Sequence, residues 1–208
     1  MNRLAAELAL KIEGRVLPGE PLREHTTWRI GGPADLLVEP ASCEDLKVVL
    51  QFAREKGLPL AVIGNGSNLL ASDAGFRGVV VKLGERMGAV SVAGSRLTAG
   101  AGAKLSRVVA IAQEAGLSGL EFTVGIPATV GGAVTMNAGA NGAAIGDLVE
   151  KVTVVDYAGQ EKTYERADLA FGYRYSHLQE LQVVVVEVVF SLNPDDPAAI
   201  RRRSQEFL

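Results

Sequence analysis

Cysteine, long apolar runs and an excess of basic charge are all missing from this sequence. Cys43 is the only cysteine among 208 residues, so the chain can form no intrachain disulfide and no cluster of thiolate metal ligands. We expect no metal site, and the cysteine usage fits a reducing, cytoplasmic compartment. Nowhere do about 18 apolar residues follow one another, so we expect no membrane insertion. The formal net charge of −3 argues against nucleic acid as a partner, because sequence-independent binding to nucleic acid relies on a positive surface.

Glycine, in contrast, is abundant. The chain contains 24 glycines, well above the usual share of about 7%. Its 48% hydrophobic and 22% charged residues are ordinary for a folded globular protein. Glycine weakens helices and strands, so a folded domain uses it densely where the backbone needs positive φ or where another group must lie against the main chain.

The hydrophobic pattern predicts an α+β fold. Residues 1–10 have the spacing of a short amphipathic helix, and Ser42 is expected to cap a second helix that ends at Gly57. Short apolar strands are expected over 60–63 and 78–83, and a strongly apolar, central strand over 183–190. A hairpin over 89–100, a helix over 103–115 and a second hairpin over 149–164 complete the pattern.

The composition shifts near Gly84, which suggests a division into lobes. We expect four segments: an N-terminal helix and lead-in (1–21), a small α/β lobe (22–84), a larger α+β lobe (85–193), and a linker with the start of a further lobe (194–208).

Two glycine-rich runs stand out, at 64–70 and at 125–142. Either run could be a set of tight turns. Alternatively, the two could form a cradle of backbone N–H groups for an anionic cofactor. The first run lacks the third glycine of the dinucleotide fingerprint and the lysine of a P-loop, so the sequence favours neither a Rossmann fold nor a nucleotide triphosphatase.

Four motifs, in this order, carry a resemblance to a known family. They are Thr27 to Ala34 (Thr-Trp-Arg-Ile-Gly-Gly-Pro-Ala), Gly64 to Leu70 (Gly-Asn-Gly-Ser-Asn-Leu-Leu), Gly125 to Ala140, and Gly172-Tyr173-Arg174. From about Leu22 to Asn193 the chain resembles the FAD-binding part of UDP-N-acetylenolpyruvoylglucosamine reductase, also called UDP-N-acetylmuramate dehydrogenase. The resemblance implies a two-lobed FAD-binding fold of the vanillyl-alcohol-oxidase/PCMH type, with non-covalent FAD between the lobes.

The resemblance also implies which residues bind the cofactor. The first glycine-rich run would face the FAD pyrophosphate, and the second would line the rest of the FAD. The cofactor-binding residues expected on this basis are Gly64, Asn65, Gly66, Ser67, Asn68, Leu69, Gly125, Ile126, Pro127, Ala128, Gly131, Gly132, Ala133, Asn137 and Gly139. No histidine lies in the first run, which argues against the covalently flavinylated oxidases of the same fold.

The implied chemistry is a two-step reduction in peptidoglycan precursor synthesis. NADPH would give a hydride to FAD, and the reduced flavin would pass it to the enolpyruvyl double bond of a UDP-sugar. Arg174 matches the family's catalytic arginine, whose permanent charge could stabilise enolate-like negative charge. Tyr173 is a second candidate for contact with the substrate, although an aromatic residue there could equally belong to the core.

The family has a further lobe with a proton-donating serine and an assisting glutamate. Neither position has a counterpart in this sequence, and Ser204 lies in a different context. We therefore expect a fragment of the reductase, with no obligate protein partner. Two alternatives remain open: an FAD-binding module or flavin carrier without reductase activity, and another FAD-dependent oxidoreductase of the same fold.

Overall fold

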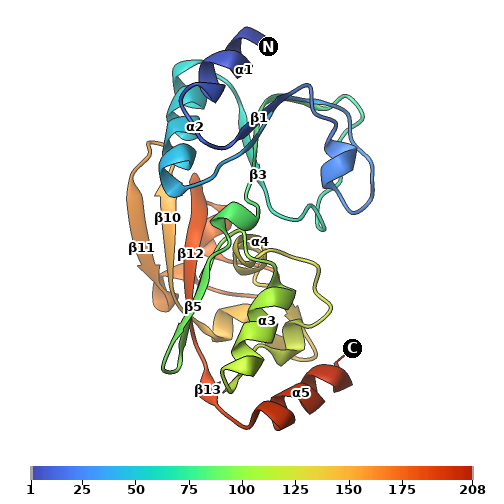
Figure 1. Ribbon diagram of the computed structural model, residues 1–208, viewed down its shortest axis with the longest axis vertical. Coiled ribbons are helices and arrows are strands. Elements are labelled where there is room, and N and C mark those ends of the chain that lie inside the picture. Colours follow the sequence, from blue (N-terminus) through green and yellow to red (C-terminus); the bar gives the residue numbers. More distant parts are fainter. Residues whose placement is uncertain (1, 208) are drawn as a thin grey trace.

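The structure is a computed structural model, and it describes residues 2–207. Strands form two main sheets, and Figure 1 shows the first sheet with α1 and α2 above the second sheet with α3 and α5. Helices and strands are mixed throughout, as expected for an α+β fold. No helix within residues 2–207 has both the length and the apolar character needed to cross a membrane.

The first sheet has four strands in the order β1-β2-β4-β3. Strand β1 pairs antiparallel with β2, whereas β2 and β3 both run parallel to β4. The elements of this part are α1 (Asn2–Ala9), β1 (Arg15–Pro18), β2 (Ala34–Glu39), α2 (Cys43–Glu55), β3 (Leu60–Ile63) and β4 (Phe76–Lys82).

Helix α2 connects the two outer parallel strands, β2 and β3, and it begins after Ser42, as the sequence predicts. The Ser42 hydroxyl accepts a hydrogen bond from the Asp45 amide at 3.1 Å, which caps the helix. Asp45 is buried, and its carboxylate accepts further bonds from the amides of Glu13, Gly14 and Ala41. These bonds fix the N-terminal lead-in against the start of the helix. Cys43 is half-buried on α2, and burial raises the pKa of its thiol.

The second sheet has five antiparallel strands in the order β11-β10-β12-β6-β5. The apolar strand β12 lies at its centre, which confirms the position predicted for it. The elements of this part are β5 (Val90–Ala93), β6 (Arg96–Gly100), α3 (Leu105–Glu114), α4 (Val130–Thr135), β10 (Val149–Asp156), β11 (Glu161–Glu165), β12 (Val183–Ser191) and α5 (Pro197–Glu206).

Short elements complete the fold. Two small strand pairs are β7 (Leu117–Ser118) with β13 (Asn193–Pro194), and β8 (Gly139–Ala140) with β9 (Ala143–Ala144). The 3-10 turns are Leu22–His25, Glu85–Met87, Glu121–Thr123, Ile145–Asp147, Arg166–Leu169 and His177–Gln179.

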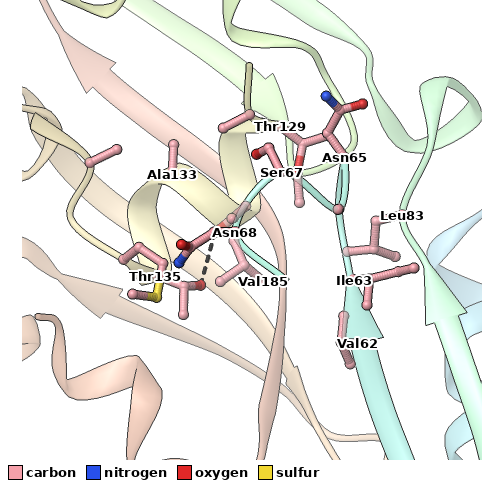
Figure 2. Close-up of a pocket in the computed structure, with 18 of the residues that line it drawn as sticks. Val62, Ile63, Asn65, Ser67, Asn68, Leu83, Thr129, Ala133, Thr135 and Val185 are labelled. Carbon is pink, nitrogen blue, oxygen red and sulfur yellow. Dashed lines mark hydrogen bonds between the residues drawn. The ribbon is translucent and has the colours of Figure 1, made fainter. Parts of the chain in front are cut away.

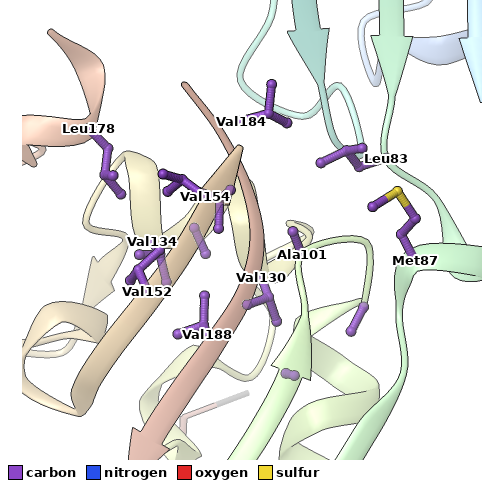
Figure 3. Packing of buried hydrophobic residues seen from close by; sticks show 14 of the residues in the cluster. Leu83, Met87, Ala101, Val130, Val134, Val152, Val154, Leu178, Val184 and Val188 are labelled. Atoms are coloured by element: carbon purple, nitrogen blue, oxygen red, sulfur yellow. The ribbon is translucent and has the colours of Figure 1, made fainter. Parts of the chain in front are cut away.

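Buried side chains of both sheets belong to one hydrophobic cluster. Figure 3 shows Leu83 and Met87, from the connection between the sheets, near Ala101 and Val184 of the second part. Full burial of a valine, leucine or methionine side chain contributes about 1.5–3 kcal/mol to folding. The connection is therefore packed rather than loose, and it holds the two sheets against one another.

One segment carries structure that the sequence did not indicate. Strand β1 lies in the expected lead-in; it is a four-residue edge strand between Gly14 and Gly19, too short to show a clear alternation. The segment 194–208, expected to be a linker with the start of a further lobe, contains α5, whose Ile200 is buried. Arg203 of this helix bonds Glu121 at 2.8 Å, so α5 packs on the second part of the molecule.

Candidate cofactor-binding cleft

A cavity of about 670 Å³ lies between the two sheets. Its walls come from the loop after β3, from α4 with the residues that precede it, and from the first residues of β12. Figure 2 shows Asn65, Ser67 and Asn68 of the loop close to Thr129, Ala133 and Thr135 around α4. The two glycine-rich runs of the sequence thus lie at the same cleft.

A direct contact joins these two runs. The Asn65 side-chain amide donates to the Pro127 carbonyl at 2.8 Å, across a separation of 62 residues. Gly64 lies so close to Thr129 that a Cβ on it would be 2.2 Å from the Thr129 hydroxyl. Gly64 is therefore required by the contact between the two walls.

The neighbouring glycines Gly131 and Gly132 of α4 face different surroundings. Gly131 packs on the end of β6, where an added Cβ would lie 2.9 Å from the Ala101 side chain. Gly132 is exposed toward the cleft, and the one atom near its hypothetical Cβ is the Thr129 hydroxyl at 3.6 Å. The face of α4 at Gly132 is thus open, so a flat ligand could approach its backbone closely.

Arg174 reaches the cleft from a tight turn. Gly172 and Tyr175 exchange backbone hydrogen bonds of 3.0 and 3.1 Å, and Arg174 between them has a φ of 53°. Positive φ costs a non-glycine residue free energy, and such backbone strain concentrates at functional sites. Nearby, the Tyr175 hydroxyl donates to Glu180, which raises the pKa of Tyr175.

Side chains around the end of α4 hold this turn. Asn137 donates to the Gly172 carbonyl at 2.7 Å and accepts from the Gly146 amide at 2.9 Å. The buried Ser176 hydroxyl donates to the Thr135 carbonyl at 2.7 Å. The element that forms one wall of the cleft therefore also positions Arg174.

The lining is apolar with a few polar groups. Among the described residues that line the cavity, Arg174 is the one charged side chain, and within residues 2–207 its guanidinium makes no hydrogen bond or ion pair. Asn65, Ser67, Asn68, Thr129 and Thr135 add amide and hydroxyl groups. This combination suits a large ligand with a broad apolar part and negative charge.

Most of the cofactor residues expected from the sequence meet at this cleft. They are Gly64, Asn65, Gly66, Ser67, Asn68, Leu69, Ile126, Ala128, Gly131, Gly132 and Ala133, and Arg174 lies with them. The structure does not bring Gly125, Pro127, Asn137, Gly139 or Tyr173 into the lining. The Asn137 side-chain amide forms hydrogen bonds with Gly172 and Gly146. The Pro127 carbonyl accepts from Asn65, and Tyr173 is 95% exposed.

Sequence reasoning missed several lining residues. They are Val62, Ile63, Leu83, Ala101, Thr129, Thr135, Met136, Ala138, Val183, Val184 and Val185. Thr129, Thr135, Met136 and Ala138 belong to the second glycine-rich run, so its small and polar residues were an available signal. The residues at the strand ends carried no such signal in the sequence, because a valine at the end of a strand cannot be distinguished from any other core valine. Within residues 2–207, no cluster of three or more histidine, cysteine or acidic side chains could hold a metal ion.

A family profile and a structural comparison together define the class of protein. The family profile described as an FAD binding domain matches residues 34–164. The structure also resembles cholesterol oxidase from B. sterolicum, with a TM-score of 0.68 at 18% identity over 88% of this chain and 38% of that chain. At this identity the likeness shows the fold alone. The chain is an FAD-binding flavoprotein domain, and the vanillyl-alcohol-oxidase/PCMH type of fold predicted from the sequence is confirmed.

Closer relatives define the family. UDP-N-acetylenolpyruvoylglucosamine reductase of Moorella thermoacetica is 49% identical over 203 residues, which are 98% of this chain and 67% of the relative. The crystal structure of UDP-N-acetylenolpyruvylglucosamine reductase (MurB) from Thermus caldophilus matches with a TM-score of 0.80 and 37% identity over 94% of this chain and 68% of that chain. This chain belongs to the UDP-N-acetylenolpyruvoylglucosamine reductase family, which confirms the resemblance carried by its four motifs. It spans about two thirds of the length of these relatives.

Proposed function

We propose that this chain forms the FAD-binding part of a reductase that converts UDP-N-acetylglucosamine enolpyruvate to UDP-N-acetylmuramate with NADPH. One observation supports the proposal above all: two glycine-rich runs and an arginine, distant in sequence, meet at a single cleft between the sheets. The reaction places the protein in peptidoglycan precursor synthesis and in the cytoplasm. We further propose that the two sheets correspond to two lobes that meet near Gly84.

The residues present fit an FAD. Its pyrophosphate would lie against the loop of Gly64 to Leu69, where backbone amides and the side chains of Ser67 and Asn68 can donate hydrogen bonds. The open backbone at Gly132 would accept the flat ring system, with Ala133 and Ile126 beside it. Gly125, Pro127, Asn137 and Gly139 would shape this wall from behind. The described lining residues include no cysteine, histidine or tyrosine, so we propose that the FAD is held non-covalently.

When bound, FAD would supply the redox chemistry that links hydride donation by NADPH to reduction of the enolpyruvyl double bond. Arg174 would bind the carboxylate of the UDP-sugar with its planar guanidinium. Its fixed positive charge would stabilise the negative charge that develops next to that carboxylate as the hydride arrives. Tyr173 lies on the same turn and is exposed, so it is available to contact the substrate.

The proposal is tested by an activity assay on the full reading frame that encodes this chain. The purified protein is mixed with FAD, NADPH and UDP-N-acetylglucosamine enolpyruvate without oxygen. We expect NADPH to be consumed in proportion to the enolpyruvyl sugar supplied, with UDP-N-acetylmuramate as the product. Binding of FAD without any consumption of NADPH would instead support the flavin carrier.

A further inference from the structure

A series of polar contacts lies behind the loop of residues 64–70. His25 Nε2 is 3.0 Å from Glu20 Oε1, and His25 Nδ1 is 2.9 Å from Lys82 Nζ. Lys82 Nζ is also 3.6 Å from Glu39 Oε1, and Glu39 pairs with Arg15 at 3.0 Å. The His25 side chain is only 10% exposed, so water competes little for these contacts.

These contacts assign one hydrogen-bonding state to the His25 ring. The ammonium group of Lys82 can only donate, so Nδ1 must accept. The Glu20 carboxylate can only accept, so Nε2 carries the hydrogen. A neutral imidazole protonated on Nε2 satisfies both partners, and His25 thereby connects Glu20 to Lys82.

The same residues surround the base of the loop. Lys82, the last residue of β4, is in register with Ile63, the last residue of β3 before the loop. On the other side the His25 carbonyl packs against Gly66, where an added Cβ would lie 1.9 Å from its oxygen. The Thr27 amide donates to the Gly66 carbonyl at 3.1 Å. The bond between His25 and Lys82 therefore closes a ring of contacts that runs from β3 through β4 and back to Gly66.

We propose that His25 and Lys82 are positioning residues for the FAD loop. Their bond holds the segment of His25 to Thr27 against Gly66, which keeps the loop amides aligned toward the FAD pyrophosphate. Both residues lie outside the set of described residues that line the cleft, so they act through the loop. This inference rests on the function proposed above.

The test compares FAD dissociation constants among variants of the chain, measured from the change in flavin fluorescence. His25→Leu and Lys82→Met each remove the bond, and His25→Gln keeps one acceptor and one donor in similar places. Lys104→Met is the matched control: it removes an equal charge from a lysine that pairs with Glu85 at 3.0 Å beside the same loop. Circular dichroism of each variant confirms folding before titration.

We expect His25→Leu and Lys82→Met each to raise the FAD dissociation constant about tenfold, as for loss of a hydrogen bond to a charged group. The double variant should have an FAD dissociation constant no higher than that of the single variant that binds FAD less tightly, because both changes break the same interaction. His25→Gln should restore most of the affinity. Unchanged affinity for FAD in the single variants would overturn the proposal. An equal loss of affinity in Lys104→Met would also overturn it, because that result would indicate only the attraction of FAD to positive charge. If the original chain bound no FAD, the proposed function would fail first and this inference with it.

Discussion

At the scale of single residues, the arrangement around Arg174 depends on Asn137. The Asn137 amide uses its donor and its acceptor to bridge Gly172 and Gly146, and Asn137 itself has a φ of 42°. Asparagine tolerates the left-handed region better than most residues, so the backbone and the side chain both favour it here. The side chain thus links the second glycine-rich run to the turn that carries Arg174.

Replacing Asn137 by Asp tests this link. A carboxylate keeps the acceptor for Gly146 but loses the donor for the Gly172 carbonyl, which would then face negative charge. We expect the free energy of unfolding in urea to fall by about 1–3 kcal/mol, the cost of an unsatisfied buried polar group. Asn141→Asp is the matched control, because Asn141 has a φ of 55° and is exposed. Equal stability of the two variants would contradict the account.

Arg174 itself is expected to act in the reaction rather than in folding. In the complete enzyme, Arg174→Ala should lower kcat about 10²–10³-fold, as for loss of one group that stabilises developing negative charge. Bound FAD and the thermal midpoint should change little, because the Arg174 guanidinium makes no bond within residues 2–207. Turnover equal to that of the original enzyme would remove Arg174 from the catalytic residues.

At this scale the sequence predicted a loop from Gly64 to Leu69, because its glycines follow a recognisable strand, and the structure has that loop at the cleft. The role of Asn137 could not be predicted in the same way. Its partners Gly146 and Gly172 lie 9 and 35 residues away, and nothing local shows that the chain brings them together. The run Val183 to Val185 was equally hidden, since only the sheet order places that end of β12 at the cleft.

At the scale of elements, α4 combines two glycines with opposite roles. Gly132→Leu should leave the stability of the chain equal or slightly higher, because glycine costs a helix about 0.5–1 kcal/mol relative to alanine. The new side chain would project into the cleft and weaken FAD binding, as measured by fluorescence titration.

Gly131→Ala supplies the contrast. Its Cβ would lie 2.9 Å from the Ala101 side chain, so the variant should unfold at a lower temperature.

If Gly132→Leu bound FAD as tightly as the original chain, the cofactor would not approach the face of α4 at Gly132.

Helix α5 depends on Arg203. Arg203 bonds Glu121, which is 5% exposed, and Asp195 at 2.6 Å. The hydrogen bond from Arg203, together with the one from the Asp196 amide, lowers the pKa of Asp195. A lowered pKa stabilises the fold above the ordinary value of 3.8, and this contribution is lost as the pH falls through the folded value.

Arg203→Met should therefore lower the thermal midpoint by a few degrees at neutral pH and reduce its dependence on pH below the ordinary aspartate pKa. The control is Arg202→Met, a change at an exposed neighbour on the same helix. Thermal unfolding monitored by circular dichroism at several pH values measures both effects. An identical pH dependence in the two variants would show that the contact with Asp195 contributes nothing.

At the scale of the whole molecule, the sequence predicted the mixed fold, most of its strands and the motifs that identify the family. It did not show how the two sheets pack. That arrangement follows from the cluster that Leu83 and Met87 share with Ala101 and Val184, and from the bond between Asn65 and Pro127. The cleft is a product of this packing, so the parts of its walls that come from Leu83, Ala101 and Val183 to Val185 emerged only from the three-dimensional structure.

The central claim is that this cleft holds one FAD without a covalent bond. The most direct measurement is to incubate the purified chain with FAD, remove free cofactor by gel filtration, and record the absorption spectrum of the protein before and after denaturation. The account predicts flavin absorption that travels with the folded chain at one FAD per chain and is released intact on denaturation. A colourless protein after gel filtration, or flavin that stays attached to the denatured chain, would contradict it.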